Sequence, residues 1–152
     1  MQMAMNKILD ENWPNRQKDL PVKTKREALI LASIVEKETG IASEREIIAS
    51  VFINRLKIGM KLQSDPTIIY SFAFGDKQKE RVIRKSDIRN GSKFNTYHIY
   101  GLPPTAIACP GKGAIKAVLN PAKTDYLYFV AKSDDVSAGH NNNVRKYRNQ
   151  LK

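Results

Sequence analysis

REALILASIVEKET, at residues 26–39, is the part of this sequence with the clearest helical pattern. Thr24 precedes it, and Glu27 follows Thr24 by three residues, which is the spacing of a capping box at a helix start. Gly40 comes directly after it and belongs to the residue type that most often ends helices. The sequence therefore predicts a helix from about Thr24 to Thr39.

One face of this predicted helix is apolar and also contains a glutamate. With about 100° between successive residues, the apolar positions of this face are Ala28, Leu31, Ile34 and Val35. Glu38 follows Ile34 by four residues and shares this face, whereas Glu36 projects to nearly the opposite side. A carboxylate that faces a core is costly unless it is hydrogen-bonded, paired or protonated. Glu38 is thus a candidate general acid, and the alternatives are that it pairs with a basic residue or caps a neighbouring helix.

A second helix is predicted directly after the first. Ser43 and Glu46 have the spacing of another capping box, and Gly59 is placed to end the helix. Its apolar positions recur at helical spacing and are Ile47, Ile48, Val51, Phe52 and Leu56. Because the connection is short, the two helices should form a helical hairpin.

The rest of the chain predicts shorter elements. Residues 1–24 are expected to be a lead-in segment with a short helix and a loop, before a domain at 25–152. Further helices are predicted at 65–70, 114–119 and 144–151, and strands at 94–100 and 125–130. Because the helices come first and the strands later, the expected fold class is α+β: an N-terminal helical hairpin that carries the candidate general acid Glu38, followed by a small sheet with short helices.

Two short segments are rich in the groups that bind sugars. The first contains Gln63, Ser64 and Asp65, and the second contains Asn95, Thr96 and Tyr97. Amides and hydroxyls can bond sugar hydroxyls, and aromatic rings can cover the apolar face of a pyranose. Helix capping would also explain Ser64 and Asp65, and strand propensity would explain the aromatic residues of the second segment.

The composition points to a polyanionic partner and excludes few classes of protein. The chain has 26 Lys and Arg residues against 15 Asp and Glu residues, a formal net charge of +11. Nucleic acid, a membrane surface or an acidic polymer would each fit this charge. One cysteine excludes an internal disulfide framework, and one cysteine with two histidines makes a structural zinc site a poor fit.

Four segments of the chain carry a resemblance to a known family. They are LASIVEKET at 31–39, SVFINRLKIGMKLQSDPTIIY at 50–70, FNTYHIYGLPPTAIACPG at 94–111 and NPAKTDYLYFVA at 120–131. In this order they resemble the endolytic murein transglycosylases of the YceG-like (MltG) family. The likeness extends from about Trp13 to Tyr147.

The resemblance implies a lytic transglycosylase that needs no metal or cofactor. Such an enzyme cleaves the bond between N-acetylmuramic acid and N-acetylglucosamine inside peptidoglycan strands and leaves 1,6-anhydromuramyl ends. The family's catalytic glutamate lies in its V-E-K-E motif and corresponds to Glu38, which acts as acid and then as base. By the same correspondence, the substrate-binding residues are Gln63, Ser64, Asp65, Asn95, Thr96 and Tyr97.

The resemblance also carries expectations about the whole protein. Family members usually begin with a cytoplasmic segment, a membrane helix and a small LysM-like domain, so this chain is expected to be the catalytic domain of a membrane-anchored protein. Its expected place is the periplasmic face of the bacterial inner membrane, with peptidoglycan strands as partner and cell-wall synthesis enzymes as further candidates. The loop before His140 and Asn141 is shorter than is usual in the family, which leaves the role of these two residues open.

Two other functions remain compatible with the residues alone. One is a peptidoglycan-binding scaffold without catalysis. The other is a basic nucleic-acid-binding module, although the sequence has no helix-turn-helix, RRM, KH or zinc pattern to support it. The family resemblance favours the enzyme and predicts no nucleic-acid partner.

Overall fold

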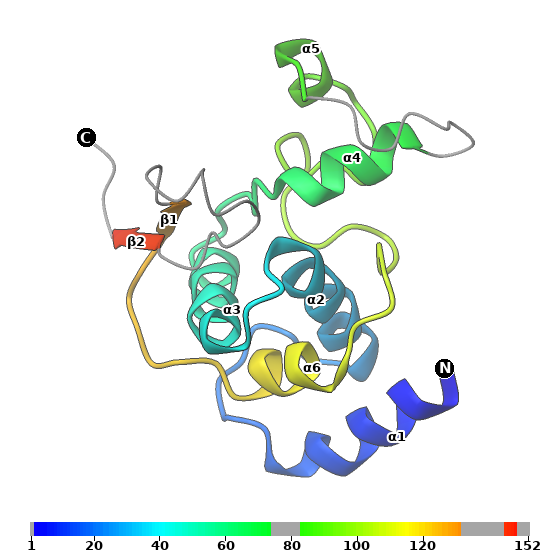
Figure 1. Ribbon diagram of the computed structural model, residues 1–152, viewed down its shortest axis with the longest axis vertical. Helices are drawn as coiled ribbons and strands as arrows, with labels where there is room; N and C mark the ends of the chain where they lie inside the picture. The colour runs from blue at the N-terminus through cyan, green and yellow to red at the C-terminus, as the bar shows by residue number, and fades with distance from the viewer. Residues whose placement is uncertain (1, 74–82, 132–144, 149–152) are drawn as a thin grey trace.

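The computed structural model describes residues 2–73, 83–131 and 145–148 of the chain (Figure 1). In chain order the elements are α1 (Gln2–Asn12), the short 3-10 helix η1 (Trp13–Asn15), α2 (Lys25–Glu38), α3 (Ala42–Lys57), α4 (Asp65–Ala73), α5 (Lys85–Ile88), α6 (Lys112–Leu119), β1 (Tyr128–Ala131) and β2 (Arg145–Arg148). The described part of the chain is therefore mostly helical, with very little strand. The predicted α+β class is therefore confirmed only in part, because the sheet is much smaller than the helical part.

Helix α2 lies at the centre of the molecule, against α3, α4 and α6 (Figure 1). Its start is the predicted capping box: the Thr24 side chain accepts from the backbone N–H of Glu27, and the Glu27 side chain accepts from the backbone N–H of Thr24. The four predicted core positions of α2 are all buried, and so are Ile30, Ala32 and Ser33. The helix is thus surrounded by protein over most of its length.

Helix α3 follows after a short turn, as predicted, but it begins differently. Ile41 is its N-terminal cap residue and makes no side-chain cap, so the capping box predicted from Ser43 and Glu46 is wrong. The buried Thr39 hydroxyl instead accepts from the backbone N–H of Ile41 at 3.0 Å and donates to Glu44 Oε1 at 3.0 Å. Thr39 therefore organises the turn from the α2 side, and the helix can start before Ser43.

A single apolar core joins the helices. Helix α6 contacts α1, α2 and α3, and the largest fully buried apolar side chains are Phe52, Leu31, Ile34, Ile48, Ile53, Leu62, Ile68, Ile115, Leu119, Val22, Val35 and Val51. Each such side chain contributes about 1.5–3 kcal/mol when it leaves water. The core therefore accounts for the mutual positions of the helices.

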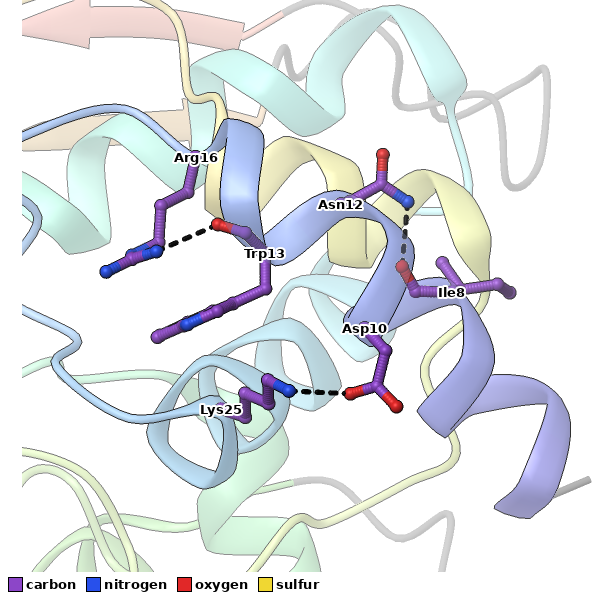
Figure 2. Close-up of polar contacts among 6 residues, drawn as sticks. All are labelled: Ile8, Asp10, Asn12, Trp13, Arg16 and Lys25. Atoms are coloured by element: carbon purple, nitrogen blue, oxygen red, sulfur yellow. Dashed lines mark hydrogen bonds and ion pairs between the residues drawn. The ribbon is translucent and has the colours of Figure 1, made fainter.

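The lead-in segment is part of this folded body. Leu9, Leu20 and Val22 belong to the apolar core. On the surface, Lys25 Nζ at the start of α2 forms an ion pair with Asp10 Oδ1 of α1 at 2.8 Å (Figure 2). The segment before residue 25 thus packs on the helices that follow it.

The strand predicted at residues 94–100 is wrong, because this segment forms consecutive turns. Asn95 is the cause: its side-chain Oδ1 accepts from the backbone N–H of Tyr97 at 3.0 Å, and its carbonyl accepts from the N–H groups of His98 and Ile99. Asparagine readily makes such local bonds to its own backbone. These turn bonds override the strand propensity of the aromatic and β-branched neighbours.

The sheet is one antiparallel pair of strands. Tyr128 in β1 pairs with Arg148 in β2, and Ala131 pairs with Arg145. The strand predicted at 125–130 is therefore confirmed in part, whereas the helix predicted at 144–151 is wrong for 145–148. The basic segment pairs with a distant strand, and such long-range pairing is invisible in a local pattern.

None of the helices within the described ranges is long and apolar enough to cross a membrane.

Candidate functional site

Glu38 is the last residue of α2, and its side chain is half-buried. The Ser64 hydroxyl donates a hydrogen bond to Glu38 Oε2 at 3.0 Å. Glu36 points elsewhere, since its Oε1 accepts from the backbone N–H of Gly111 at 2.7 Å, directly before α6. It is thus Glu36 that caps a neighbouring helix, and Glu38 that meets the polar segment before α4.

Ser64 is held by a network of buried hydroxyl groups. Its backbone N–H donates to Thr96 Oγ1 at 2.8 Å, and its carbonyl accepts from Thr67 Oγ1 at 2.7 Å. Thr67 Oγ1 and Thr96 Oγ1 lie 2.8 Å apart. All three residues are almost completely buried. Because buried hydrogen bonds are costly to break, this network fixes the Ser64 hydroxyl against Glu38.

Gln63 and Asp65, on either side of Ser64, are exposed. Gln63 has a φ of 52°, a left-handed conformation that is uncommon outside glycine, and its N–H donates to the Thr96 carbonyl at 3.2 Å. Asp65 begins α4, and its Oδ1 accepts from the Tyr97 hydroxyl at 2.6 Å. A strained backbone at such a position is a common companion of functional sites.

Tyr97 is half-buried and titrates at high pH. Burial raises its pKa well above the ordinary value of 10.0, and the hydrogen bond to Asp65 raises that pKa further. The hydroxyl is therefore a stable hydrogen-bond donor at neutral pH.

Asn95 lies beneath the site and not on its surface. Its side chain is fully buried, and its Nδ2 donates to the carbonyls of Ile88 at 2.9 Å and Asn90 at 2.7 Å. Its Oδ1 accepts a hydrogen bond from the Tyr97 N–H. The bonds of this amide go to the loop that holds Thr96 and Tyr97 in place.

Arg55 is a site residue that the sequence reasoning missed. It is 5% exposed, its Nε donates to the Leu127 carbonyl at 2.7 Å, and its Nη1 donates to the Leu62 carbonyl. Burial lowers the pKa of Arg55, while interaction with Tyr128, Glu38 and Tyr97 opposes that shift. An arginine three residues after Phe52 on an apolar helix face was the available signal.

The structure thus brings together Glu38 and Ser64 with the turn that contains Thr96 and Tyr97, although their segments are far apart in the sequence. His140 and Asn141 lie outside the described residues. Within the described ranges, no group of three or more His, Cys, Asp and Glu side chains could hold a metal ion. A half-buried carboxylate among fixed hydroxyl donors can transfer a proton to a bound polar substrate.

Comparison with known proteins shows which family the chain belongs to. Residues 1–152 match the profile of the YceG-like family. The chain is 48% identical over 106 residues to an endolytic murein transglycosylase of Bacillus subtilis (strain 168), covering 70% of this chain and 28% of that protein. It is 36% identical over 144 residues to an endolytic murein transglycosylase of Streptococcus pneumoniae serotype 2, covering 91% of this chain and 24% of that protein.

A solved structure supports the same relationship. A crystal structure of a putative yceG-like protein from Listeria monocytogenes superposes with a TM-score of 0.76 and 32% identity, covering 98% of this chain and 43% of that one. This chain spans only about a quarter of the length of the transglycosylases of Bacillus subtilis and Streptococcus pneumoniae. With the profile match, the sequence identities and the superposition in agreement, the chain belongs to the YceG-like family.

Proposed function

We propose that this domain is a lytic transglycosylase that cleaves glycan strands of peptidoglycan and that Glu38 is its catalytic acid and base. The contact between Glu38 Oε2 and the Ser64 hydroxyl carries the proposal, because it holds a half-buried carboxylate in one orientation at the start of a polar, partly exposed surface. The relatives are endolytic murein transglycosylases by name, and this supplies the substrate class.

The proposed reaction is an internal transfer that needs one carboxylic acid. Protonated Glu38 gives its proton to the glycosidic oxygen, and the bond from that oxygen to C1 of N-acetylmuramic acid breaks. The C6 hydroxyl of the same sugar attacks C1 and forms the 1,6-anhydro ring. Ionised Glu38 accepts the C6 proton, so the enzyme returns to its starting state and no water is consumed. The attacking group is already part of the substrate, which lowers the entropic cost of the step.

The neighbouring residues take different parts in this proposal. Gln63, Asp65 and Tyr97 present polar atoms at the surface and are the proposed contacts to the sugars. Ser64 and Thr96 orient Glu38, and Asn95 supports the turn from below. The cation of Arg55 favours the ionised form of Glu38 after proton transfer.

The proposal extends to the whole protein as follows. Residues 25–152 form the catalytic domain, with residues 1–24 leading into it. The full protein is anchored at the periplasmic face of the inner membrane and acts beside cell-wall synthesis enzymes. The net charge of +11 favours residence near acidic peptidoglycan and an anionic membrane surface.

The decisive experiment compares two glutamates of α2. We expect Glu38→Gln to abolish the release of anhydro-muropeptides from purified peptidoglycan, because an amide cannot donate the proton that the leaving oxygen needs. Glu36→Gln is the matched control, since its amide oxygen can still accept from the Gly111 N–H, and it should keep most of the activity. Mass spectrometry of the products gives the readout, and circular dichroism checks that both variants fold.

Undiminished product release by folded Glu38→Gln would contradict the assignment of the catalytic residue. If the wild-type domain binds peptidoglycan and releases no anhydro products, the domain is a binding scaffold and not an enzyme.

A further inference from the structure

Exposed Tyr100 and partly buried Lys61 form a pair beside the candidate site. The Tyr100 side chain is 72% exposed, and Lys61 Nζ lies 5.0 Å from the centroid of its ring, within the range of a cation–π interaction. Exposure of one aromatic residue is ordinary. What distinguishes this pair is its position relative to Glu38.

The pair lies on the two segments that build the site. Lys61 is three residues before Ser64, and Tyr100 is three residues after Tyr97. Bonds between the segments join Gln63 N–H to the Thr96 carbonyl at 3.2 Å and the Tyr97 hydroxyl to Asp65 at 2.6 Å.

The segments therefore run side by side from the Glu38 contact to the Lys61–Tyr100 pair. Three extended residues span at most about 10 Å, so the pair is close enough to touch a neighbouring part of a strand bound at Glu38.

We propose that Lys61 and Tyr100 form a glycan-binding subsite next to the cleavage site. The proposal rests on the proposed function, because its occupant is another part of the strand that Glu38 cleaves. A sugar ring stacks its apolar face on the side of the Tyr100 ring that Lys61 leaves open, as sugars do on aromatic rings. The Lys61 ammonium group binds a carboxylate of the same strand.

Two parts of peptidoglycan can supply this carboxylate. In strands with stem peptides, the lactyl group of N-acetylmuramic acid is an amide and the charge belongs to the peptide. In strands without stem peptides, the lactyl group itself is the carboxylate. Both sources offer the same chemistry to Lys61, and the substrates used in the test distinguish them.

The test measures affinity in the Glu38→Gln background, which binds strands without cutting them. We expect Tyr100→Ala to weaken binding of both stem-bearing and stem-free soluble strands by about three- to tenfold, whereas Tyr100→Phe, which keeps the ring, should bind as the parent does. Lys61→Gln should weaken binding of stem-bearing strands, stem-free strands or both by about two- to fivefold. The kind of strand that is affected identifies the source of the carboxylate. In the active enzyme, Tyr100→Ala should raise KM with kcat little changed.

Arg16→Gln is the matched control. Arg16 lies over the Trp13 ring at 4.0 Å next to α1, so the substitution removes the same charge from another aromatic–cation pair (Figure 2). Helix α1 lies at the opposite end of the molecule from α4, which follows Ser64 (Figure 1). Arg16→Gln should leave the affinity unchanged, and an effect as large as that of Lys61→Gln would show that only net charge matters and would overturn the role of Lys61.

The subsite and the proposed function can fail separately. If the wild type releases anhydro products while Tyr100→Ala and Lys61→Gln bind both kinds of strand as the parent does, the subsite is overturned and the enzyme stands. If the wild type releases no anhydro products, the proposed function fails irrespective of these affinities.

Discussion

Glu36 and Glu38 are two residues apart and have different neighbours. Glu36 accepts from Gly111 at the start of α6, and Glu38 accepts from Ser64 before α4. A rotation of about 200° around the helix separates the two side chains, so the helical period alone distinguishes them. The identity of the group that meets Glu38 was not predictable in this way, because Ser64 reaches it through the tertiary fold.

The raised pKa of Tyr97 predicts how the unfolding free energy changes at alkaline pH. Its pKa is raised in the folded state, so its stabilising effect is complete below the unfolded value of 10.0 and is lost as pH rises above it. Above pH 10.0, the unfolding free energy should fall less steeply for Tyr97→Phe than for the wild type, by at most about 1.4 kcal/mol per pH unit. Urea denaturation at a series of pH values measures this difference.

The test is the comparison of the pH dependence of unfolding between the wild type and Tyr97→Phe. Parallel curves for the wild type and Tyr97→Phe would show that the Tyr97 hydroxyl has no special environment. Tyr100→Phe is a suitable control, because the Tyr100 side chain is 72% exposed and the chain keeps every other tyrosine.

At the scale of elements, the starts of α2 and α3 show when a local capping pattern predicts where a helix begins and when it does not. Both begin near a Ser or Thr followed three residues later by Glu, yet only Thr24 and Glu27 form a capping box. At α3 the buried Thr39 hydroxyl holds the preceding turn, and Ser43 lies inside the helix. A contact made by the buried end of one helix thus decided where the next begins.

This difference predicts unequal effects of two similar substitutions. Thr24→Ala should lower the unfolding free energy by about 1 kcal/mol, because it leaves the Glu27 N–H without its cap. Ser43→Ala, the matched control, should change it by less than about 0.5 kcal/mol, since the Ser43 side chain is exposed and is not the cap of α3. Thermal or urea denaturation measures both, and equal losses would contradict the assigned helix starts.

At the scale of the whole molecule, Arg55 joins three parts of the site. It projects from α3, bonds the Leu62 carbonyl before α4 and bonds the Leu127 carbonyl before β1. Its guanidinium group also lies 5.3 Å from the centroid of the Tyr128 ring. The residue therefore ties the small sheet and the polar segment of the site to the helical core.

Loss of this cation should be costly. Arg55→Met should lower the unfolding free energy by about 2–3 kcal/mol, because two partly buried carbonyls lose their donors. Arg26→Met is the matched control: Arg26 Nη2 bonds the Pro104 carbonyl at 2.8 Å on the exposed surface, and its loss should cost less than about 0.5 kcal/mol. Similar midpoints in urea for the two variants would contradict the joining role of Arg55.

The sequence by itself determined the central helices and made Glu38 a candidate for the catalytic residue. Their apolar spacing and the cap of α2 are local properties that follow from the geometry of one helix. The motifs of the polar segments also predict Ser64, Thr96 and Tyr97 as substrate-binding residues, and this role stays a prediction.

Only the tertiary structure decided what these residues do for one another. The turn around Asn95, the pairing of β1 with β2 and the burial of Arg55 all depend on partners far along the chain or on side-chain bonds that compete with propensity. For that reason the period of its helix makes Glu38 a candidate, whereas the hydroxyl network beside it exists only where α2, the segment before α4 and the Asn95 turn pack together.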